Sequence, residues 1–222
     1  MDKFEVVGIV LVLVSFVVGA VAYPSMPDKM VSHWNAQGVA DGSMNKFWGV
    51  FLLPAIILVM EAFFLLIPRI DPLRANIAKF RKEFGWFTVG ITVFMLAIYK
   101  QTLLWNMGIL INPAQTLPIL IAFLFYIVGA LCEKSKRNWF IGMRTPWTMS
   151  SDKIWDKTNR LTGRMFKWAA LISAIGVFAG GYAIAFILIP ALAIAAYAFI
   201  YSYMEFQNEK DGRKKAARRR KR

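Results

Sequence analysis

"WAALISAIGVFAGGYAIAFILIPALAIAAYAFIYSYM", residues 168–204, decides the fold, because 37 consecutive residues carry no charge. A single helix of that length would measure about 55 Å at 1.5 Å per residue, whereas the hydrocarbon core of a bilayer is about 30 Å thick. Two membrane spans joined by a tight turn therefore fit better than one span. Gly180 and Gly181 provide the best turn signal, although Pro190 could instead mark a kink.

Four further apolar stretches precede this one, so the chain is predicted to cross the membrane six times. With 58% hydrophobic residues, it is more apolar than the usual soluble domain. A signal peptide is an alternative for the first stretch, but its length and the poor cleavage site "AVAYPSMP" favour a retained helix. The four stretches are residues 6–23, 47–67, 86–111 and 117–131.

The positions of the 27 Lys and Arg residues set the expected orientation. If both termini lie in the cytoplasm, only Lys29, Lys46 and Lys100 fall outside the cytoplasmic segments. Such an asymmetry follows the positive-inside rule, whereas five spans would put the nine cations of the tail outside. The expected fold is an all-α, multi-pass protein of the cell membrane, with six transmembrane helices and cytoplasmic N- and C-termini.

Two cytoplasmic segments are predicted to form amphipathic helices at the membrane surface. In residues 71–85, Asp71 is a good N-cap and Pro72 a good first helical residue. The second helix is expected to be capped by Ser150 and to place a row of cations beside an apolar face. The apolar face of the first helix comprises Leu73, Ile77, Phe80, Phe84 and Phe87, and the cations of the second are Lys153, Lys157, Arg160, Arg164 and Lys167.

These features divide the chain into four regions. Residues 1–46 hold the first span and an extracellular loop, and residues 47–133 hold spans two to four. Residues 134–205 contain the second amphipathic helix and spans five and six, and residues 206–222 form a basic tail. The tail is predicted to be solvated and disordered at an anionic leaflet, with RNA as an alternative partner because a run of cations attracts any polyphosphate.

Two motifs show a family resemblance. "YPSMPDKMVSHWNAQGVADG", residues 23–42, resembles an element of an uncharacterised domain that often begins SdpI-type membrane proteins. "RNWFIGMRTPWTMSSDKIWDKTNRLTGRMF", residues 137–166, is similar to the long signature of the SdpI family itself. The resemblance implies an integral membrane protein without catalytic activity or cofactor, which provides immunity to a secreted peptide toxin. It also implies signal transduction, in which a cytoplasmic repressor is held at the membrane once the toxin is present.

Residues of the second motif form the first set of candidates. Two arginines with Asn and Thr side chains could bind an anion, a lipid headgroup or a carboxylate of a partner. The alternative is a loop that satisfies its own backbone and anchors tryptophans at the headgroup layer. The candidates are Arg137, Asn138, Gly142, Arg144, Thr145, Pro146, Trp147, Thr148, Trp155, Thr158, Asn159, Arg160 and Gly163.

The extracellular loop supplies the second set of candidates. Its prolines exclude a continuous helix and its glycines mark turns, so we expect a compact loop with room for a short hairpin. Toxin contact is one interpretation, and a loop held together by its own hydrogen bonds is the other. A metal site of His33, Asp28 and Asp41 has weak support because the spacing is unhelpful, and no metal is expected. The candidates are Pro24, Pro27, His33, Trp34, Asn35, Gly38, Asp41 and Gly42.

Glu61 and Lys100 lie inside the predicted second and third spans, where charged residues are costly and often functional. Their expected depths differ by about 10 Å, so a direct ion pair does not follow from the sequence. Lys100 could instead extend its ammonium group toward the aqueous interface.

Three functions are compatible with these residues. The first is an immunity protein or receptor for a peptide toxin. The second is a small transporter or lipid-handling protein for an anionic solute, in which Glu61, Lys100 and the Arg-rich turn of the second motif would form the path. The third is a membrane tether that binds a nucleoprotein partner through the basic tail. An enzyme with a histidine-based triad or metal centre is not expected, because the sequence contains one histidine, His33.

Overall fold

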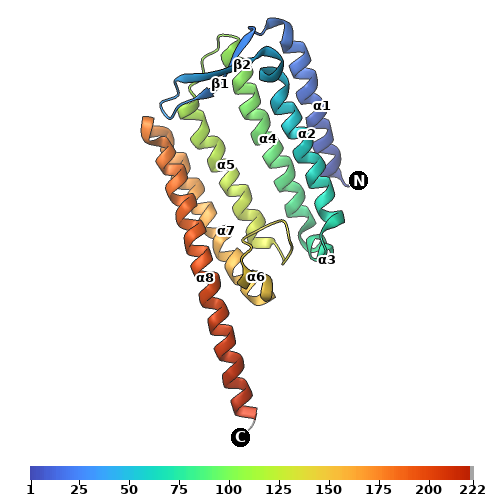
Figure 1. The fold of residues 1–222 in the computed structure, drawn as a ribbon, viewed down its shortest axis with the longest axis vertical. Helices are drawn as coiled ribbons and strands as arrows, with labels where there is room; N and C mark the ends of the chain where they lie inside the picture. Colours follow the sequence, from blue (N-terminus) through green and yellow to red (C-terminus); the bar gives the residue numbers. More distant parts are fainter. Residues whose placement is uncertain (221–222) are drawn as a thin grey trace.

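The computed structural model describes the backbone of residues 1–220 and the side chains of residues 1–212. Within that part of the chain, six helices are long and apolar enough to cross a membrane, as the sequence predicts. They run side by side along one axis, with an antiparallel hairpin at one end (Figure 1). The elements are α1 (Lys3–Ala22), β1 (Lys29–Trp34), β2 (Ala40–Asn45), α2 (Lys46–Ile70), α3 (Arg74–Ile77), α4 (Arg81–Asn106), α5 (Pro113–Lys134), α6 (Pro146–Ser150), α7 (Asp152–Ile175) and α8 (Ala183–Arg220).

The two ends of the bundle differ in what they carry. The amino end of α1 and the carboxyl end of α8 both point away from β1 and β2 (Figure 1). We call these the termini end and the hairpin end. The six apolar helices in the described chain explain this arrangement, because an even number of crossings returns the chain to the end where it began.

In the part of the chain that the structure describes, the core contains three clusters within one bundle, of which two lie among the membrane-crossing helices and the third around Phe80 at the termini end. Helices α1, α2 and α4 enclose a cluster beneath the hairpin, in which Met30 and Val50 are fully buried. Helices α5, α7 and α8 enclose another, which includes Phe125 and Ile187. Contacts between α4 and α5 join the two clusters, so that the hairpin and the last two spans belong to one packed unit.

The turn expected within residues 168–204 is present. Helix α7 ends at Ile175 and α8 begins at Ala183, and two short 3₁₀ turns lie between them. Gly180 has a φ of +56°, a left-handed conformation that glycine adopts without a steric penalty. Pro190 lies inside α8 and not at the break, so the glycine signal is the correct one of the two.

The first predicted surface helix, residues 71–85, differs from the prediction in extent and environment. The segment forms α3, then a 3₁₀ turn that ends at Phe80, then the start of α4. The N-cap of α3 is Leu73, whose N–H donates to Asp71 Oδ1 at 2.6 Å. Ile77 and Phe84 are almost fully buried against other parts of the protein, because the segment folds back onto the ends of α2 and α5. Its apolar face therefore contacts protein where contact with lipid was expected.

The second predicted surface helix is the first half of a longer one. Helix α7 begins at Asp152 and continues without a break into the fifth span. Ser150 does not cap it, because its hydroxyl donates to the carbonyl of Trp147 at 2.8 Å inside α6. The cationic row and the apolar span are thus parts of one rigid element.

The tail also differs from the expectation of disorder. Helix α8 extends from the sixth span to Arg220, so the described backbone of residues 206–220 is helical. Ala, Lys, Arg and Glu dominate this segment and favour helix strongly. The side chains from Arg213 onward, which include most cations of the tail, lie outside the described residues.

Candidate functional site

Asn138 organises the loop between α5 and α6. Its side chain is fully buried, and its amide group donates to the carbonyls of Lys136 (2.8 Å) and Ile141 (3.0 Å). Its Oδ1 accepts from the N–H groups of Phe140 (2.9 Å) and Ile141 (2.7 Å). Both donors and both lone pairs of the amide are therefore used inside the loop, which leaves Asn138 nothing to offer a ligand.

The same loop is tied to the segment between α2 and α3. Asp71 Oδ2 accepts from the N–H of Trp139 at 2.9 Å, and Asn76 donates to the carbonyl of Arg137 at 2.9 Å. Arg137 also pairs with Asp152 at 2.8 Å and donates to a backbone carbonyl of α6 at 2.9 Å. Three segments that are far apart in the sequence are thereby fastened together at the termini end.

Position 142 requires glycine for two reasons, its backbone conformation and the close approach of a neighbouring side chain. Its φ is +102°, and a Cβ atom there would lie 2.5 Å from Asn159 Oδ1. That oxygen accepts from the N–H of Met143 at 2.7 Å, and the Asn159 side chain is almost fully buried. The loop therefore approaches α7 closely enough for Asn159 to hold its backbone.

Thr145 and Thr148 cap α6 reciprocally and connect it to α8. Thr148 N–H donates to Thr145 Oγ1 at 3.1 Å, while Thr145 N–H donates to Thr148 Oγ1 at 2.8 Å. Pro146 occupies the first position of α6, where its missing N–H costs nothing. The Thr145 hydroxyl also lies 3.0 Å from the hydroxyl of Ser202, and Trp147 packs edge-on against two aromatic rings of α8.

Helices α5 and α7 cross at a pair of glycines. A Cβ atom on Gly163 would lie 2.5 Å from the carbonyl oxygen of Gly129, and the reverse distance is 2.6 Å. Near this crossing, Lys167 pairs with Glu133 at 2.8 Å. Trp155, which is fully buried, donates its indole N–H to the carbonyl of Ser135 at 3.1 Å. The motif helix α7 is thus held against α5 and against Ser135, the residue that follows α5.

Most of the motif candidates are buried. This supports the interpretation that their polar groups form hydrogen bonds within the protein and do not bind a ligand. Arg144 and Arg160 are the exposed cationic members. Arg144 donates to the carbonyl of Trp139, whereas Arg160 faces a groove beside α8. The buried members are Asn138, Thr145, Thr148, Trp155, Thr158, Asn159 and Gly163.

At the hairpin end, β1 and β2 form the expected hairpin. His33 lies opposite Gly42, and its Nδ1 is 2.5 Å from Asp41 Oδ1 with both side chains exposed. Asn35 Oδ1 accepts from two N–H groups of the turn that contains Gly38, each at 3.0 Å. Among the described residues no group of three or more His, Cys, Asp or Glu side chains could hold a metal ion.

The hairpin is pinned to the helices beneath it. The side-chain amide of Asn106, in α4, accepts from the N–H of Val31 at 2.8 Å and donates to the carbonyl of Val31 at 3.0 Å. These are the two bonds that a residue of a neighbouring strand would make with Val31. Met30 is fully buried against α2. Pro24 lies in the 3₁₀ turn that ends α1, and Pro27 follows that turn before β1 starts.

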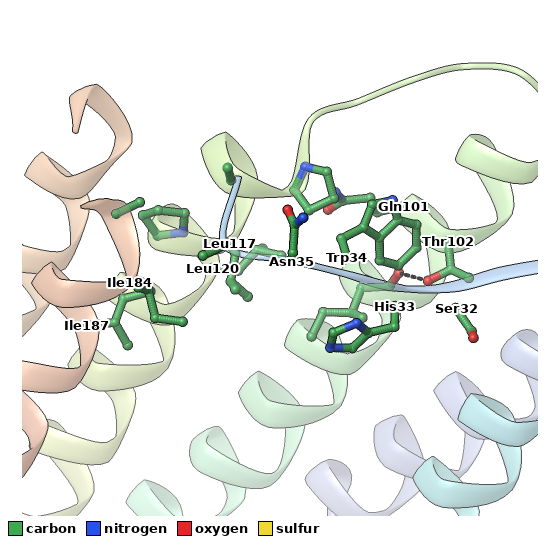
Figure 2. A pocket seen from close by; sticks show the side chains of 16 residues that line it. Ser32, His33, Trp34, Asn35, Gln101, Thr102, Leu117, Leu120, Ile184 and Ile187 are labelled. Atoms are coloured by element: carbon green, nitrogen blue, oxygen red, sulfur yellow. Dashed lines mark hydrogen bonds between the residues drawn. The ribbon is translucent and has the colours of Figure 1, made fainter. Parts of the chain in front are cut away.

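A cavity of about 280 Å³ lies beside the hairpin, between β1 and helices α4, α5 and α8 (Figure 2). Leu117 and Leu120 form one wall, and Ile184 and Ile187 form another. Trp34 lies on the strand that covers the opposite side (Figure 2). The lining is mainly apolar, with a few polar groups at the strand, which is the usual character of a small binding pocket.

Trp34 carries an unused hydrogen-bond donor at this cavity. Its ring packs edge-on against Trp105 with 5.4 Å between centroids. Its Nε1 is inaccessible to solvent and has no hydrogen-bond partner within the described residues. A buried donor without an acceptor is uncommon, because burial removes its bond to water.

Comparisons with known proteins agree with this arrangement of two ends. A family model described as the SdpI/YfhL protein family matches residues 134–203, and a domain of unknown function (DUF1648) matches residues 10–58. The immunity protein SdpI of Bacillus subtilis (strain 168) is 22% identical over 205 residues, which cover 90% of this chain and 95% of that protein. The chain is thus similar to an SdpI/YfhL protein over most of its length. No solved structure matches it.

The two matched segments together include the hairpin at one end and the polar loop between α5 and α6 at the other. Residues 10–58 include the hairpin, whereas residues 134–203 include the polar loop, α6, all of α7 and about half of α8. Helices α4 and α5 lie between them in the sequence and contribute Asn106 and part of the cavity wall. The family resemblance inferred from the two motifs is confirmed.

The charged residues of the second and third spans are not brought together. Glu61 is buried, accepts from the hydroxyl of Thr92 and lies over Gly8, where a Cβ would be 2.6 Å from its Oε2. Lys100 is exposed, eight residues further along α4 than Thr92 and hence about 12 Å away along the axis. The structure thus gives each charge a separate environment.

Three residues that hold the site were not among the site residues predicted from the sequence. Asp71, Ser135 and Ser202 each bond to the motif from an element distant in sequence. The sequence predicts only a helix-capping role for Asp71, and the residues around it give no indication that its carboxylate accepts from the N–H of Trp139. For Ser202 the sequence does offer a signal, because it is a polar residue inside an apolar span.

Proposed function

We propose that this protein is an SdpI-like immunity protein, which protects the cell that carries it from a secreted peptide toxin. The observation that carries the proposal is the match to the immunity protein SdpI, which covers 90% of this chain and includes both ends of the molecule. The family is one of membrane proteins and not a recognised group of enzymes.

In the proposed orientation the hairpin end faces the exterior. The cations concentrate in segments at the termini end, and Lys29, Lys46 and Lys100 are the exceptions in the sequence. The positive-inside rule then places both termini in the cytoplasm. A toxin that arrives from outside would meet the hairpin end, where β1, β2 and the cavity beside them lie.

The cavity is the proposed point of contact with the toxin. Its volume of about 280 Å³ suits one or two apolar side chains of a peptide. The indole N–H of Trp34 has no acceptor and is closed to solvent, so a movement of its ring on binding would let it donate to a backbone carbonyl of the same peptide. Binding of the toxin is expected to be driven by burial of its apolar side chains, with Trp34 contributing orientation.

The polar loop at the termini end is the proposed structural lock of the bundle. It joins α2, α5, α7 and α8 through buried hydrogen bonds, so a change in the position of α8 would alter it directly. Ile184 and Ile187 at the cavity belong to the same helix as Ser202. Helix α8 is therefore the proposed route by which an occupied cavity would be reported to a cytoplasmic partner such as a repressor.

The proposal is tested by expressing the chain in toxin-sensitive cells that lack an immunity protein. Survival is then measured against increasing doses of secreted peptide toxins. Cells with the wild-type chain should survive doses that kill cells with the empty vector. Equal killing by every toxin tried, with the protein present in the membrane, would contradict the proposal.

The cavity is tested by filling its mouth. Ile184→Trp adds bulk at the cavity, and Ile189→Trp makes the same change on the exposed face of the same helix. Excluding one apolar side chain of the toxin should weaken binding about tenfold or more, so I184W should lower the tolerated dose by a similar factor. I189W should protect like the wild type, and equal protection by both variants would remove the cavity from the proposal.

A further inference from the structure

A basic groove separates α7 from α8 at the termini end. Its volume is about 530 Å³, and it opens to the surface. Neither the polar loop nor the hairpin-end cavity contributes to it. Its charged and hydroxyl-bearing lining residues are Lys153, Asp156, Lys157, Arg160, Arg164 and Tyr201.

Two of these charges are neutralised within the protein, and two arginines are not. Lys157 pairs with Glu205 of α8 at 2.6 Å. Asp156 pairs with Lys136 at 2.9 Å. Arg160 and Arg164 are exposed and have no ion-pair partner among the described residues.

The spacing of these arginines makes the groove electrostatically unfavourable when empty. Arg160 and Arg164 are four residues apart on a helix, so their guanidinium groups lie on the same face and repel each other. Lys157 is three residues before Arg160 on that face. An anion placed between the arginines would replace repulsion with attraction, and guanidinium groups are well suited to phosphate because they can donate two parallel hydrogen bonds.

The face that carries the arginines becomes apolar as α7 continues into the membrane. Trp168, Leu171 and Ile175 follow Arg164 at spacings of four, three and four residues, and they are 68%, 57% and 58% exposed. On the opposite wall, Tyr197 lies one turn beyond Tyr201 and is 49% exposed. Phosphate-binding side chains are thus followed, in the direction of the bilayer centre, by an exposed apolar surface.

We propose that this groove binds an anionic phospholipid, with the phosphate between Arg160 and Arg164 and an acyl chain along Trp168 and Leu171. A soluble phosphate would use the arginines but would leave the apolar continuation unused. Basic pockets between transmembrane helices are known to suit the headgroups of such lipids. The bound lipid would contact both α7 and α8, which line the groove, and would so stabilise their packing.

The experiment uses the full chain purified in a neutral detergent. Phosphatidylglycerol, phosphatidylcholine, glycerol phosphate and inorganic phosphate are titrated separately, and bound lipid is counted by native mass spectrometry alongside the melting temperature. Phosphatidylglycerol should bind and raise the melting temperature, and the other three should not. Binding by inorganic phosphate or glycerol phosphate as strong as that of phosphatidylglycerol would overturn the assignment to a lipid.

The groove is identified by paired variants. R160Q/R164Q removes two cations there, and R74Q/K82Q removes two exposed cations from the same end of the bundle. Each cation near a membrane surface contributes about fivefold to lipid binding, so the first variant should bind phosphatidylglycerol about 30-fold more weakly. R74Q/K82Q should bind like the wild type, and an equal loss in both variants would overturn the proposal in favour of general surface attraction.

A third variant keeps every charge and so covers the case in which R160Q/R164Q fails to fold. Trp168→Ala removes the first apolar contact of the proposed acyl chain. It should weaken the binding of phosphatidylglycerol severalfold and lower the temperature rise that the lipid causes. Unchanged binding in W168A would overturn the proposed path of the acyl chain and with it the assignment to a lipid.

Discussion

The two ends of the bundle use polar side chains in opposite ways. At the termini end, Asn138 and Asn159 are buried and hydrogen-bonded to the backbone of one loop. At the hairpin end, a cavity of about 280 Å³ remains open beside the strands, and Trp34 has a donor without a partner in the described chain. The first end is built to hold helices in place, and the second has unused binding capacity.

This difference teaches where mutation should harm folding and where it should harm recognition. Removing one partner of a buried hydrogen bond lowers the free energy of unfolding more than removing one partner of an exposed bond. The remaining buried group has no water to bond to, whereas an exposed group does. Substitutions in the polar loop should therefore destabilise the protein. Substitutions around the hairpin should alter ligand contact with less effect on stability.

The largest effect is expected for Asn138→Ala. The change leaves several buried backbone groups unsatisfied, and we expect the free energy of unfolding to fall by about 3 kcal/mol. This change in the free energy of unfolding is measured by titrating the protein with a denaturing detergent. Asn208→Ala, at an exposed position of α8, is the control and should change stability little. Equal stability of the two variants would show that the polar loop does not stabilise the bundle.

Gly163→Ala is expected to come second. The added methyl group would lie 2.5 Å from the carbonyl oxygen of Gly129, so α5 and α7 must separate, at a cost of about 2 kcal/mol. Gly212→Ala meets no atom within 4 Å and should be neutral or slightly stabilising. The same detergent titration compares both variants, and only Gly163→Ala should lower the free energy of unfolding. A stabilising G163A would mean that the helices do not cross at the glycines.

Asn106→Ala should have a smaller effect on stability and a larger one on the hairpin. Loss of the two bonds to Val31 should cost about 1 kcal/mol, because Val31 lies nearer to solvent than the polar loop does. Hydrogen exchange at the amide of Val31 should accelerate, whereas exchange at Ile141 should not change. Gln37→Ala, in the exposed turn, serves as the comparison. Slow exchange at Val31 in N106A would refute the pinning role.

The smallest effect is a loosening of the termini end by acid. Burial alone would raise the pKa of Asp2, but the N–H of Glu5 and the Arg81 guanidinium outweigh it and lower that pKa. Asp2 therefore stabilises the folded state above its ordinary pKa of about 3.9, and this contribution is lost as the pH falls through the lower folded value. Asp2→Asn should flatten the dependence of the melting temperature on pH below about 4. An unchanged dependence would remove Asp2 from the network.

Much of the fold could be predicted because hydrophobic length and charge are local properties. The uncharged run of residues 168–204 determines two spans, and the glycine pair places their turn. The buried surface of the segment around Phe80 could not be predicted. An apolar stripe looks the same in the sequence whether it faces lipid or a neighbouring helix, and the packing of α2 and α5 decides between them.

The candidate site shows the same division. The motif residues could be recognised from the sequence, and so could the hairpin with its His33 and Asn35. Their partners could not, because Asp71, Ser135 and Ser202 are distant in sequence and hydrogen bonds between distant segments have no periodicity. The sequence by itself determined how many times the chain crosses the membrane, since that depends on the length and polarity of each stretch. Only the tertiary structure decided which polar groups are satisfied and which are left for a ligand, since that depends on which helices meet.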